Sequence, residues 1–290
     1  MTGSALFRLI GIVFTAVTCI VIGDTAGKLL TSGGVDPFLV AWARFGLAAI
    51  VLLPFSGLAK AELPALLNWR ILLRSVFVVG GICGMLTALK TEPLANVFGA
   101  FFVGPIVSYI LAIIFLGEKP SALRGWLLAL GFLGVMLVVK PGFGASAGIF
   151  YALGAGVFYG AYLVMTRTVA GQFRPRFLLI SQLLIGTAVL TPFGLSVEMP
   201  TVTQPLILLL TLSALASALG NYLLVVANKT AEASLIAPLI YTQLISATVL
   251  GVLVFGEWPD TFALMGLVLI AASGFGSLIA SQSRLLKKHG

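Results

Sequence analysis

Long apolar segments follow one another along almost the whole chain, separated by short stretches that contain charged residues, proline or glycine. Many of these segments approach the roughly 20 apolar residues with which an α-helix crosses a bilayer. The pattern predicts ten spans, at residues 6–31, 37–56, 72–89, 94–116, 122–139, 147–166, 177–195, 205–227, 233–255 and 262–281. Because the connections are short, they leave no room for a domain outside the membrane. We therefore expect the function to lie inside the bundle.

Composition supports the bilayer as the solvent of this chain. Of the 290 residues, 60% are hydrophobic and only 9% are charged, whereas soluble domains carry about 25% charged residues. The first apolar stretch, from Phe7 to Leu30, is too long for the core of a signal peptide and lacks a small-residue cleavage site, so we expect it to remain as the first span. The predicted fold class is an all-α integral membrane protein.

The distribution of basic residues predicts the orientation. With the N-terminus in the cytoplasm, two of the 17 basic residues, Lys90 and Lys140, fall outside, and Lys28 and Arg44 fall within spans. The other thirteen fall inside, as cytoplasmic connections of membrane proteins prefer; they are Arg8, Lys60, Arg70, Arg74, Lys119, Arg124, Arg167, Arg174, Arg176, Lys229, Arg284, Lys287 and Lys288. Both termini are therefore predicted to be cytoplasmic. The net charge of +8 orients helices, and no nucleic-acid partner is expected.

An internal repeat divides the chain. An offset of 139 residues superposes Lys90-Thr91 on Lys229-Thr230, and the Gly-Glu-Lys-Pro turn at 117–120 on the Gly-Glu-Trp-Pro turn at 256–259. The predicted halves are residues 1–142 and 143–290, with five spans each. Because five is odd, the second half enters the membrane from the opposite side, which allows two inverted halves to alternate around a site near the midplane. The alternative is an old duplication kept only for packing.

Ten spans in two fivefold repeats, each with a Gly-Glu-x-Pro turn after its fourth helix, resemble the drug/metabolite transporter superfamily, and specifically its EamA-type exporters. The resemblance covers essentially the whole chain. By size and aromatic content the chain is most similar, within that group, to the bacterial aromatic amino acid exporters. The resemblance implies a multi-pass protein of the bacterial inner membrane, whose partners are lipid and a small-molecule substrate.

Asp24, Lys28 and Arg44 are the convincing cases of ionisable residues inside the membrane. Asp24 and Lys28 are four residues apart and share one face of the first helix. Arg44 lies in the second span at a similar depth, so the three are predicted to form one charge cluster that holds a gate or meets a substrate carboxylate. The alternative is an outer-leaflet ion pair whose basic side chains extend toward the headgroups. At offsets of 137 and 138 the repeat mates are Ala161, Met165 and Gln182, so the second half lacks the cluster.

Polar and aromatic residues within the spans predict a second site. An apolar pocket with a few polar anchors suits an amphiphilic organic solute. Phe102 and Tyr241 are mates at the offset of 139, which predicts two rings on opposite walls of a pseudo-twofold cavity, lined by spans four and nine. The alternative role for such residues is packing or interface anchoring. The candidate substrate-binding residues are Asn96, Phe98, Phe101, Phe102, Tyr159, Tyr162, Asn221, Tyr222, Tyr241 and Gln243.

Two prolines lie within the fourth spans of the repeats. Pro105 and Pro238 each remove a helical hydrogen bond and can kink the helix. Because they are not at matching positions, the two kinks are expected to differ.

Several function classes lack the residues they need. The single histidine is His289 in the tail, and Cys19 and Cys83 both lie in apolar runs, so neither a metal site nor a cofactor is predicted. No phosphate-binding loop is present, so we expect no nucleotide. An enzyme acting on lipids would need clustered acidic, histidine or serine residues. A structural subunit would not need the polar residues in spans four, six, eight and nine.

The sequence thus predicts a transporter and not an enzyme. The expected function is export of small organic solutes, with aromatic or hydrophobic amino acids as substrates, by alternating access. Asp24 is the one clear acidic residue in the membrane, so either it relays protons or transport is uncoupled; the resemblance to exporters favours an uncoupled uniporter. The alternative is a proton-coupled multidrug or other metabolite carrier, and the residues leave import open.

Overall fold

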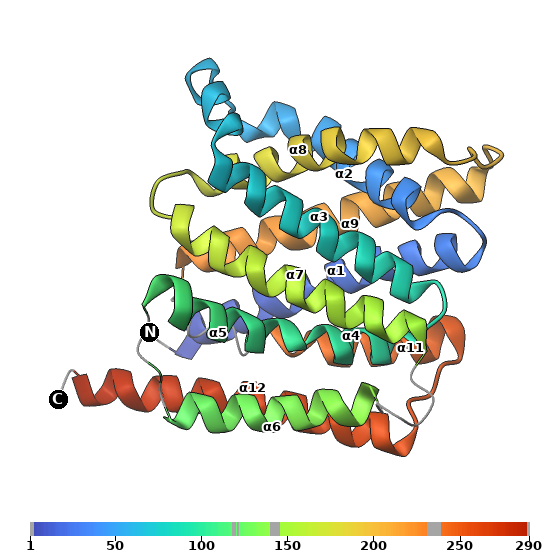
Figure 1. Ribbon diagram of the computed structural model, residues 1–290. Coiled ribbons are helices and arrows are strands. Elements are labelled where there is room, and N and C mark those ends of the chain that lie inside the picture. The colour runs from blue at the N-terminus through green and yellow to red at the C-terminus, as the bar shows by residue number, and fades with distance from the viewer. Residues whose placement is uncertain (1–2, 118–119, 121, 140–145, 231–238, 289–290) are drawn as a thin grey trace.

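The computed structural model describes residues 3–117, 120, 122–139, 146–230 and 239–288. All regular structure in these ranges is helical, and most of the helices run side by side along one direction (Figure 1). The elements are α1 (Gly3–Ser32), α2 (Pro37–Ser56), the 3-10 helix η1 (Lys60–Leu67), α3 (Trp69–Leu89), α4 (Leu94–Phe101), α5 (Val103–Leu116), α6 (Ala122–Val139), α7 (Ala147–Val169), α8 (Pro175–Ser196), α9 (Gln204–Thr230), α11 (Gln243–Phe255) and α12 (Thr261–Lys288).

The described helices coincide with the predicted spans. Seven helical segments are long and apolar enough to cross a membrane, with α4 and α5 taken as one segment, Leu94–Leu116. Three shorter apolar helices, Gly125–Val139, Gln243–Phe255 and Thr261–Gly276, lie where the fifth, ninth and tenth spans are predicted. Residues 231–238, which include Pro238, lie outside the described ranges. An all-helical membrane fold is therefore established, and the count of ten crossings stays a prediction.

Helix ends explain the repeated turn motif. The first glycine of each turn, Gly117 after α5 and Gly256 after α11, adopts a left-handed conformation, with φ of 65° and 70° respectively. A residue without a Cβ is favoured at such a helix end. The motif thus marks where the fourth helix of each repeat ends.

The fourth span of the first repeat is broken at Phe102, between α4 and α5. The Phe102 N–H is shared between the carbonyls of Phe98 (3.2 Å) and Gly99 (3.3 Å). Three residues later, Pro105 has no N–H to offer the carbonyl of Phe101. The proline therefore accounts for a break one turn before it.

The second repeat is broken at the equivalent place. Tyr241 and Thr242 form a turn before α11, in which the Thr242 N–H donates to the Leu239 carbonyl at 3.1 Å. Tyr241 is the repeat mate of Phe102. The expectation that the kinks at Pro105 and Pro238 differ stays a prediction.

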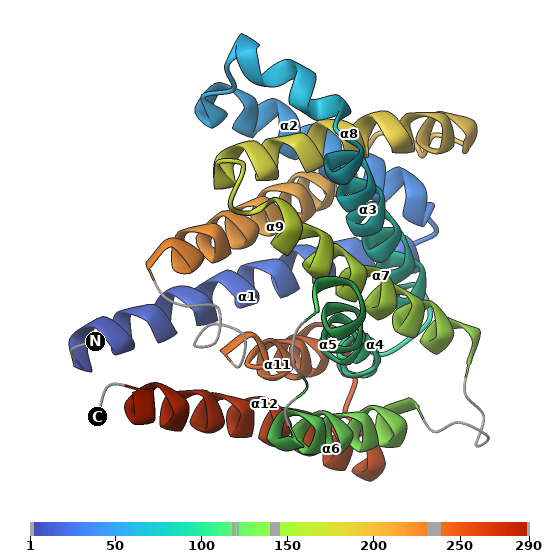
Figure 2. The same ribbon diagram turned by 60° about the vertical axis from the view of Figure 1, so that its left-hand side comes forward.

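Close helix packing follows the same pseudo-twofold relation. Helix α1 lies against α9, and α3 lies against α7 (Figures 1 and 2). A Cβ at Gly220 would lie 2.4 Å from the Ala16 carbonyl oxygen, and a Cβ at Gly81 would lie 3.5 Å from that of Ala155. These contacts exchange under the offset of 139 residues. The repeat in the sequence is therefore also a repeat in the packing.

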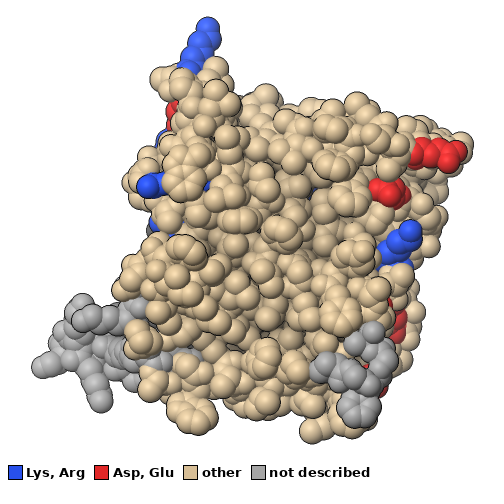
Figure 3. All heavy atoms as spheres, in the orientation of Figure 1, with Lys and Arg blue, Asp and Glu red and all other residues tan. Residues whose placement is uncertain are grey.

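The outer surface is that of a membrane protein. Charged side chains gather at the two ends of the molecule, and a broad uncharged band lies between them (Figure 3). Both termini lie at the same end of the bundle (Figure 1). That end is the cytoplasmic one in the predicted orientation.

Candidate functional site

A central cavity of about 90 Å³ lies between the two repeats, where the broken fourth helices meet. Helix α4 and the segment around α11 both line it, as expected for spans four and nine. Seven of the predicted site residues line this cavity: Asp24, Arg44, Phe98, Phe101, Tyr159, Asn221 and Gln243. The remaining lining is mostly apolar: Ile20, Val78, Gly81, Ile82, Met85, Ser217, Leu224 and Ile240. Residues from both halves of the chain thus form one space.

Five of the seven predicted aromatic residues form a continuous series of ring contacts. The rings of Phe102 and Tyr241 are stacked with centroids 4.7 Å apart, and Phe102 meets Phe101 edge-on at 6.3 Å. Phe101 continues to Tyr159 at 4.9 Å, and Tyr159 stacks on Tyr162 at 5.7 Å. Such offset and edge contacts are favourable geometries for aromatic rings. Because Phe102 and Tyr241 touch directly, the prediction that they face each other across a cavity is wrong: the two helix breaks meet too closely.

Asp24 and Arg44 form a buried ion pair on the cavity wall. The Arg44 Nη1 donates to Asp24 Oδ1 at 2.5 Å, and its Nη2 donates to the hydroxyl of Ser217. Only 5% of Asp24 and 6% of Arg44 is exposed. In the described part of the chain, the Arg44 Nε has no hydrogen-bond acceptor. The pair connects α1, α2 and α9.

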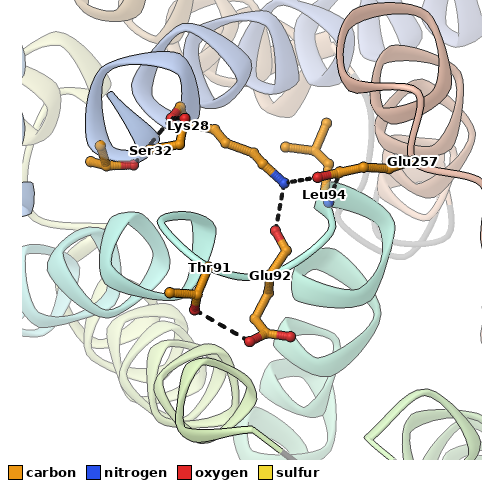
Figure 4. A network of polar contacts seen from close by, with 7 residues as sticks. Lys28, Ser32, Thr91, Glu92, Leu94 and Glu257 are labelled. Carbon is orange, nitrogen blue, oxygen red and sulfur yellow. Dashed lines mark hydrogen bonds and ion pairs between the residues drawn. The ribbon is translucent and has the colours of Figure 1, made fainter. Parts of the chain in front are cut away.

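Lys28 belongs to a different pair, so the prediction of one three-charge cluster is wrong. Its Nζ forms an ion pair with Glu257, after α11, and donates to the carbonyl of Glu92 at 2.6 Å (Figure 4). The other oxygen of Glu257 accepts the Leu94 N–H at 2.9 Å. Lys28 lies one helical turn further along α1 than Asp24, and Asp24 is already paired with Arg44. We call the contacts of Lys28, Glu257, Glu92 and Leu94 the latch.

The burial of Lys28 and Arg44 argues against the alternative in which their side chains extend toward the lipid headgroups. Only 4% of Lys28 and 6% of Arg44 is exposed, so neither side chain extends to the surface. Buried ion pairs of this kind within a membrane helix bundle are usually functional.

Arg74 was missed by the sequence reasoning, which placed it in a cytoplasmic connection. The structure buries it in α3, where it donates to Thr166 Oγ1 (2.8 Å), the Leu178 carbonyl (2.8 Å), Gln182 Oε1 (2.9 Å) and the Tyr162 hydroxyl (3.0 Å). All four acceptors are neutral. The guanidinium also lies 4.8 Å from the Tyr162 ring centroid.

The Arg74 cluster is the pseudo-twofold counterpart of the Asp24–Arg44 pair. The cluster joins α3, α7 and α8, the helices that correspond to α9, α1 and α2 of the pair, and at an offset of 138 Arg44 corresponds to Gln182. In the pair the cation comes from the second span of the first half, whereas Arg74 comes from the third span of the same half. The second half therefore contributes neutral acceptors to this cluster, and the polar mate Gln182 was the signal available in the sequence.

The family model described as "EamA-like transporter family" matches residues 8–140 and again residues 146–279. The chain belongs to the EamA-like transporter family. It is therefore a membrane transporter and not an enzyme. The two matches correspond to the two repeats, and the domain limits at 142 and 143 remain predictions.

Relatives of this EamA-like transporter carry names for two different solutes. A riboflavin transporter of Rhizobium johnstonii is 26% identical over 80% of this chain and 78% of its own length. A riboflavin transporter of Vibrio cholerae is 27% identical over 83% and 82%. An S-adenosylmethionine uptake transporter of Rickettsia prowazekii is 24% identical over 92% and 91%. A crystal structure with 18% identity covers 99% of both chains with a TM-score of 0.65, which shows the same fold.

Two further hollows lead from the central cavity of this EamA-like transporter toward the end where α2 finishes and α8 begins. A space of about 40 Å³ shares Arg44, Ser217 and Asn221 with the central cavity. It shares Leu179 with a hollow of about 400 Å³, which the predicted residue Tyr222 lines. The latch lies toward the opposite end of the bundle, near the end of α1.

The remaining predicted residues lie off these spaces. Asn96 is on α4, and its buried Oδ1 has no hydrogen-bond partner in the described part of the chain. Pro105 is on α5, and Pro238 lies outside the described residues. No group of three histidine, cysteine, aspartate or glutamate side chains that could hold a metal ion occurs in the ranges searched.

Proposed function

We propose that this EamA-like transporter moves a small organic solute with an aromatic ring through its central cavity by alternating access of its two inverted halves. One observation carries the proposal: the cavity lies where the broken fourth helices of the two repeats meet, and its walls combine aromatic rings with an ion pair. Broken helices at a repeat interface are a common position for transporter substrates.

The two solutes in the names of the relatives share an aromatic ring, and neither is a free aromatic amino acid. Riboflavin and S-adenosylmethionine both contain flat heteroaromatic rings, and Phe101 and Tyr159 offer ring faces and edges in the cavity. Two of the three relatives above are named only as transporters and the third is named for uptake. The proposal therefore keeps the aromatic solute, drops the amino acid and favours uptake over export.

The proposed cycle alternates which end is closed. In the described state the latch joins α1 to the turn after α11 and to the start of α4 (Figure 4). Toward the other end, the hollows beside α2, α8 and α9 continue from the cavity. Release on the latched side requires Lys28 to leave Glu257, while the hollows close.

We further propose that transport is a uniport. Asp24, the acidic residue expected to relay protons in a coupled mechanism, is held by Arg44 inside the bundle. A carboxylate committed to an ion pair is a poor carrier of a proton at each cycle, because protonation would leave the guanidinium buried without its counter-ion. This supports the solute gradient as the driving force.

Flux of labelled riboflavin, S-adenosylmethionine and tyrosine into liposomes that contain only the purified protein tests this function. We expect riboflavin or S-adenosylmethionine to enter faster than into empty liposomes, at the same rate with and without a pH gradient, and we expect tyrosine to enter no faster. Tyr159→Ala should abolish most of this flux. Tyr151→Ala is the matched control, since Tyr151 lies on the same helix, is 53% exposed and is absent from the cavity lining. Equal loss in both variants, or no flux of riboflavin and of S-adenosylmethionine, would overturn the proposal.

A further inference from the structure

One donor on the wall of the central cavity has no partner. Arg44 uses its Nη1 for Asp24 and its Nη2 for Ser217, but its Nε has no acceptor in the described part of the chain. Arg44 is 94% buried, and it lines both the central cavity and the adjoining hollow of about 40 Å³. Buried donors in proteins are nearly always satisfied, so a single unsatisfied one at a cavity indicates a missing acceptor.

Asp24 limits what this acceptor can be. Asp24 lines the same cavity and balances the charge of Arg44, so the two together carry no net charge. A solute carboxylate or phosphate brought to Arg44 would lie beside the Asp24 carboxylate. Like charges at such short range repel strongly where little water is present. A carbonyl oxygen or a ring nitrogen can accept from Nε without this repulsion.

The rest of the wall indicates what carries the acceptor. Phe98, Phe101 and Tyr159 line the cavity, and the rings of Phe101 and Tyr159 lie 4.9 Å apart at an angle of 42°. A flat ring packed on these side chains would occupy the same space that Arg44 borders. The space of about 90 Å³ is smaller than the roughly 300 Å³ at which solute pockets begin, so the cavity must widen when it is loaded.

We propose that the Asp24–Arg44 pair selects uncharged, flat heteroaromatic solutes whose ring carbonyl or ring nitrogen accepts a hydrogen bond from Arg44 Nε. This inference rests on the proposed function and names the solute class of the same cavity. Arg44 supplies the donor, Asp24 holds Arg44 and rejects anions, and the aromatic wall holds the ring.

Binding to the purified full-length protein separates the solute classes. Riboflavin is uncharged and has ring carbonyls; riboflavin 5′-phosphate has the same ring and a negative charge. Tyrosine is zwitterionic, and S-adenosylmethionine carries a net positive charge. We expect riboflavin to bind at least tenfold more tightly than each of the other three. Tighter or equal binding of the phosphate, of tyrosine or of S-adenosylmethionine, or no binding of riboflavin, would overturn the inference.

Variants test the role of Arg44 itself. In Arg44→Lys the single side-chain nitrogen can still pair with Asp24, but the Nε donor to the solute is lost. Riboflavin affinity should therefore fall about tenfold, the cost of one charge-assisted hydrogen bond. Arg174→Lys is the matched control, because Arg174 lies at the surface and pairs with Glu62 outside the cavity. An unchanged affinity in a folded Arg44→Lys protein would contradict the assignment.

A second variant works in the opposite direction. Asp24→Asn leaves the positive charge of Arg44 unbalanced, so the ratio of phosphate to riboflavin affinity should rise at least tenfold; an unchanged ratio would overturn the role given to Asp24. Liposome flux of riboflavin distinguishes the two levels of the argument. Selective riboflavin binding without flux supports this site and refutes the proposed transport function, whereas flux with a preference for charged solutes does the reverse.

Discussion

Phe102 and Tyr241 stack with ring centroids 4.7 Å apart and planes inclined by 27°. Each ring marks the break in the fourth span of its repeat, so the contact fixes the two breaks against one another beside the central cavity. One contact between equivalent residues thus joins the two halves of the chain.

The stacked rings of Phe102 and Tyr241 should stabilise the fold together, so substitutions at the two positions should not be additive in the free energy of unfolding. In a double-mutant cycle with Phe102→Leu and Tyr241→Leu, we expect a coupling energy of about 1 kcal/mol beyond the loss of buried area. Thermal unfolding of the detergent-purified protein measures it. The stacked pair Phe38 and Phe193, at 5.8 Å on the exposed surface, is a control that should couple less. Additive effects at Phe102 and Tyr241 would count against this link.

The latch should control access to the end it closes. Lys28→Ala removes the cation between Glu257 and the Glu92 carbonyl, so that end should open more often. A single cysteine at Leu94, which is fully buried at the latch, reports this opening in a background with Cys19 and Cys83 replaced by alanine. We expect several-fold faster labelling by a membrane-impermeant maleimide.

Lys90→Ala is the control for the latch, because Lys90 is exposed at the same end and forms no part of it. In the Lys90→Ala protein, the cysteine at position 94 should be labelled at the same rate as in the protein with an unaltered latch. If Lys28→Ala also leaves the rate unchanged, Lys28 does not hold this end closed.

Gly220 should tolerate no side chain. A Cβ there would lie 2.4 Å from the Ala16 carbonyl oxygen and 2.7 Å from Ile20, so Gly220→Ala must separate α1 from α9. We expect the free energy of unfolding to fall by about 1–3 kcal/mol, as for overpacked cores in general. Thermal unfolding measures this change. Gly154→Ala on α7 is the matched change, since nothing lies within 4 Å of the added atom. Because alanine favours a helix more than glycine does, Gly154→Ala should not destabilise the protein. A comparable loss of unfolding free energy in both variants would contradict the contact with α1 as the cause.

The surface pair of Glu62 and Arg174 should give a pH-dependent contribution. The hydrogen bond from Arg174, followed by that from the Ala59 backbone N–H, lowers the pKa of Glu62 from its ordinary value of 4.5. A carboxyl with a lowered pKa stabilises the fold fully above the ordinary pKa, and the contribution disappears as the pH falls through the lowered pKa.

Glu62→Gln should therefore lower the unfolding temperature at pH 7. The difference from the unaltered protein should begin to shrink below pH 4.5 and vanish once the pH has fallen through the lowered pKa. Glu198→Gln, the same change in the connection after α8, provides the comparison. A difference that persists in acid would mean that the glutamine disturbs something other than this ion pair.

Most of the fold could be predicted because the bilayer imposes it. Apolar segments of spanning length and the repeated Gly-Glu-x-Pro turn place the described α-helices but not the 3-10 helix η1. The offset of 139 pairs the helices that exchange under the pseudo-twofold relation. The positions of the breaks were harder to predict. A proline shows which hydrogen bond a helix lacks, but the position of each break also depends on contacts with the other repeat. Here Phe102 and Tyr241, one at each break, stack on one another.

The sequence could identify many of the residues of the candidate site, but it could identify only some of their ion-pair and hydrogen-bond partners. Burial makes Asp24, Lys28 and Arg44 costly and therefore conspicuous, yet the partner of each depends on distances between helices. Glu257 was read as part of a turn, although that turn brings its carboxylate to Lys28. Arg74 was assigned to a connection because it lies one turn from the start of α3, and four neutral oxygens from α7 and α8 allow its burial.

A single carboxylate serves three elements in the latch. Glu257 holds Lys28 of α1 with one oxygen and the first N–H of α4 with the other, and it is itself placed by the left-handed glycine that ends α11. Movement of the turn that carries Glu257 therefore breaks both contacts at once. We expect opening of this end to be a cooperative, switch-like event, because displacement of one carboxylate releases α1 and α4 together.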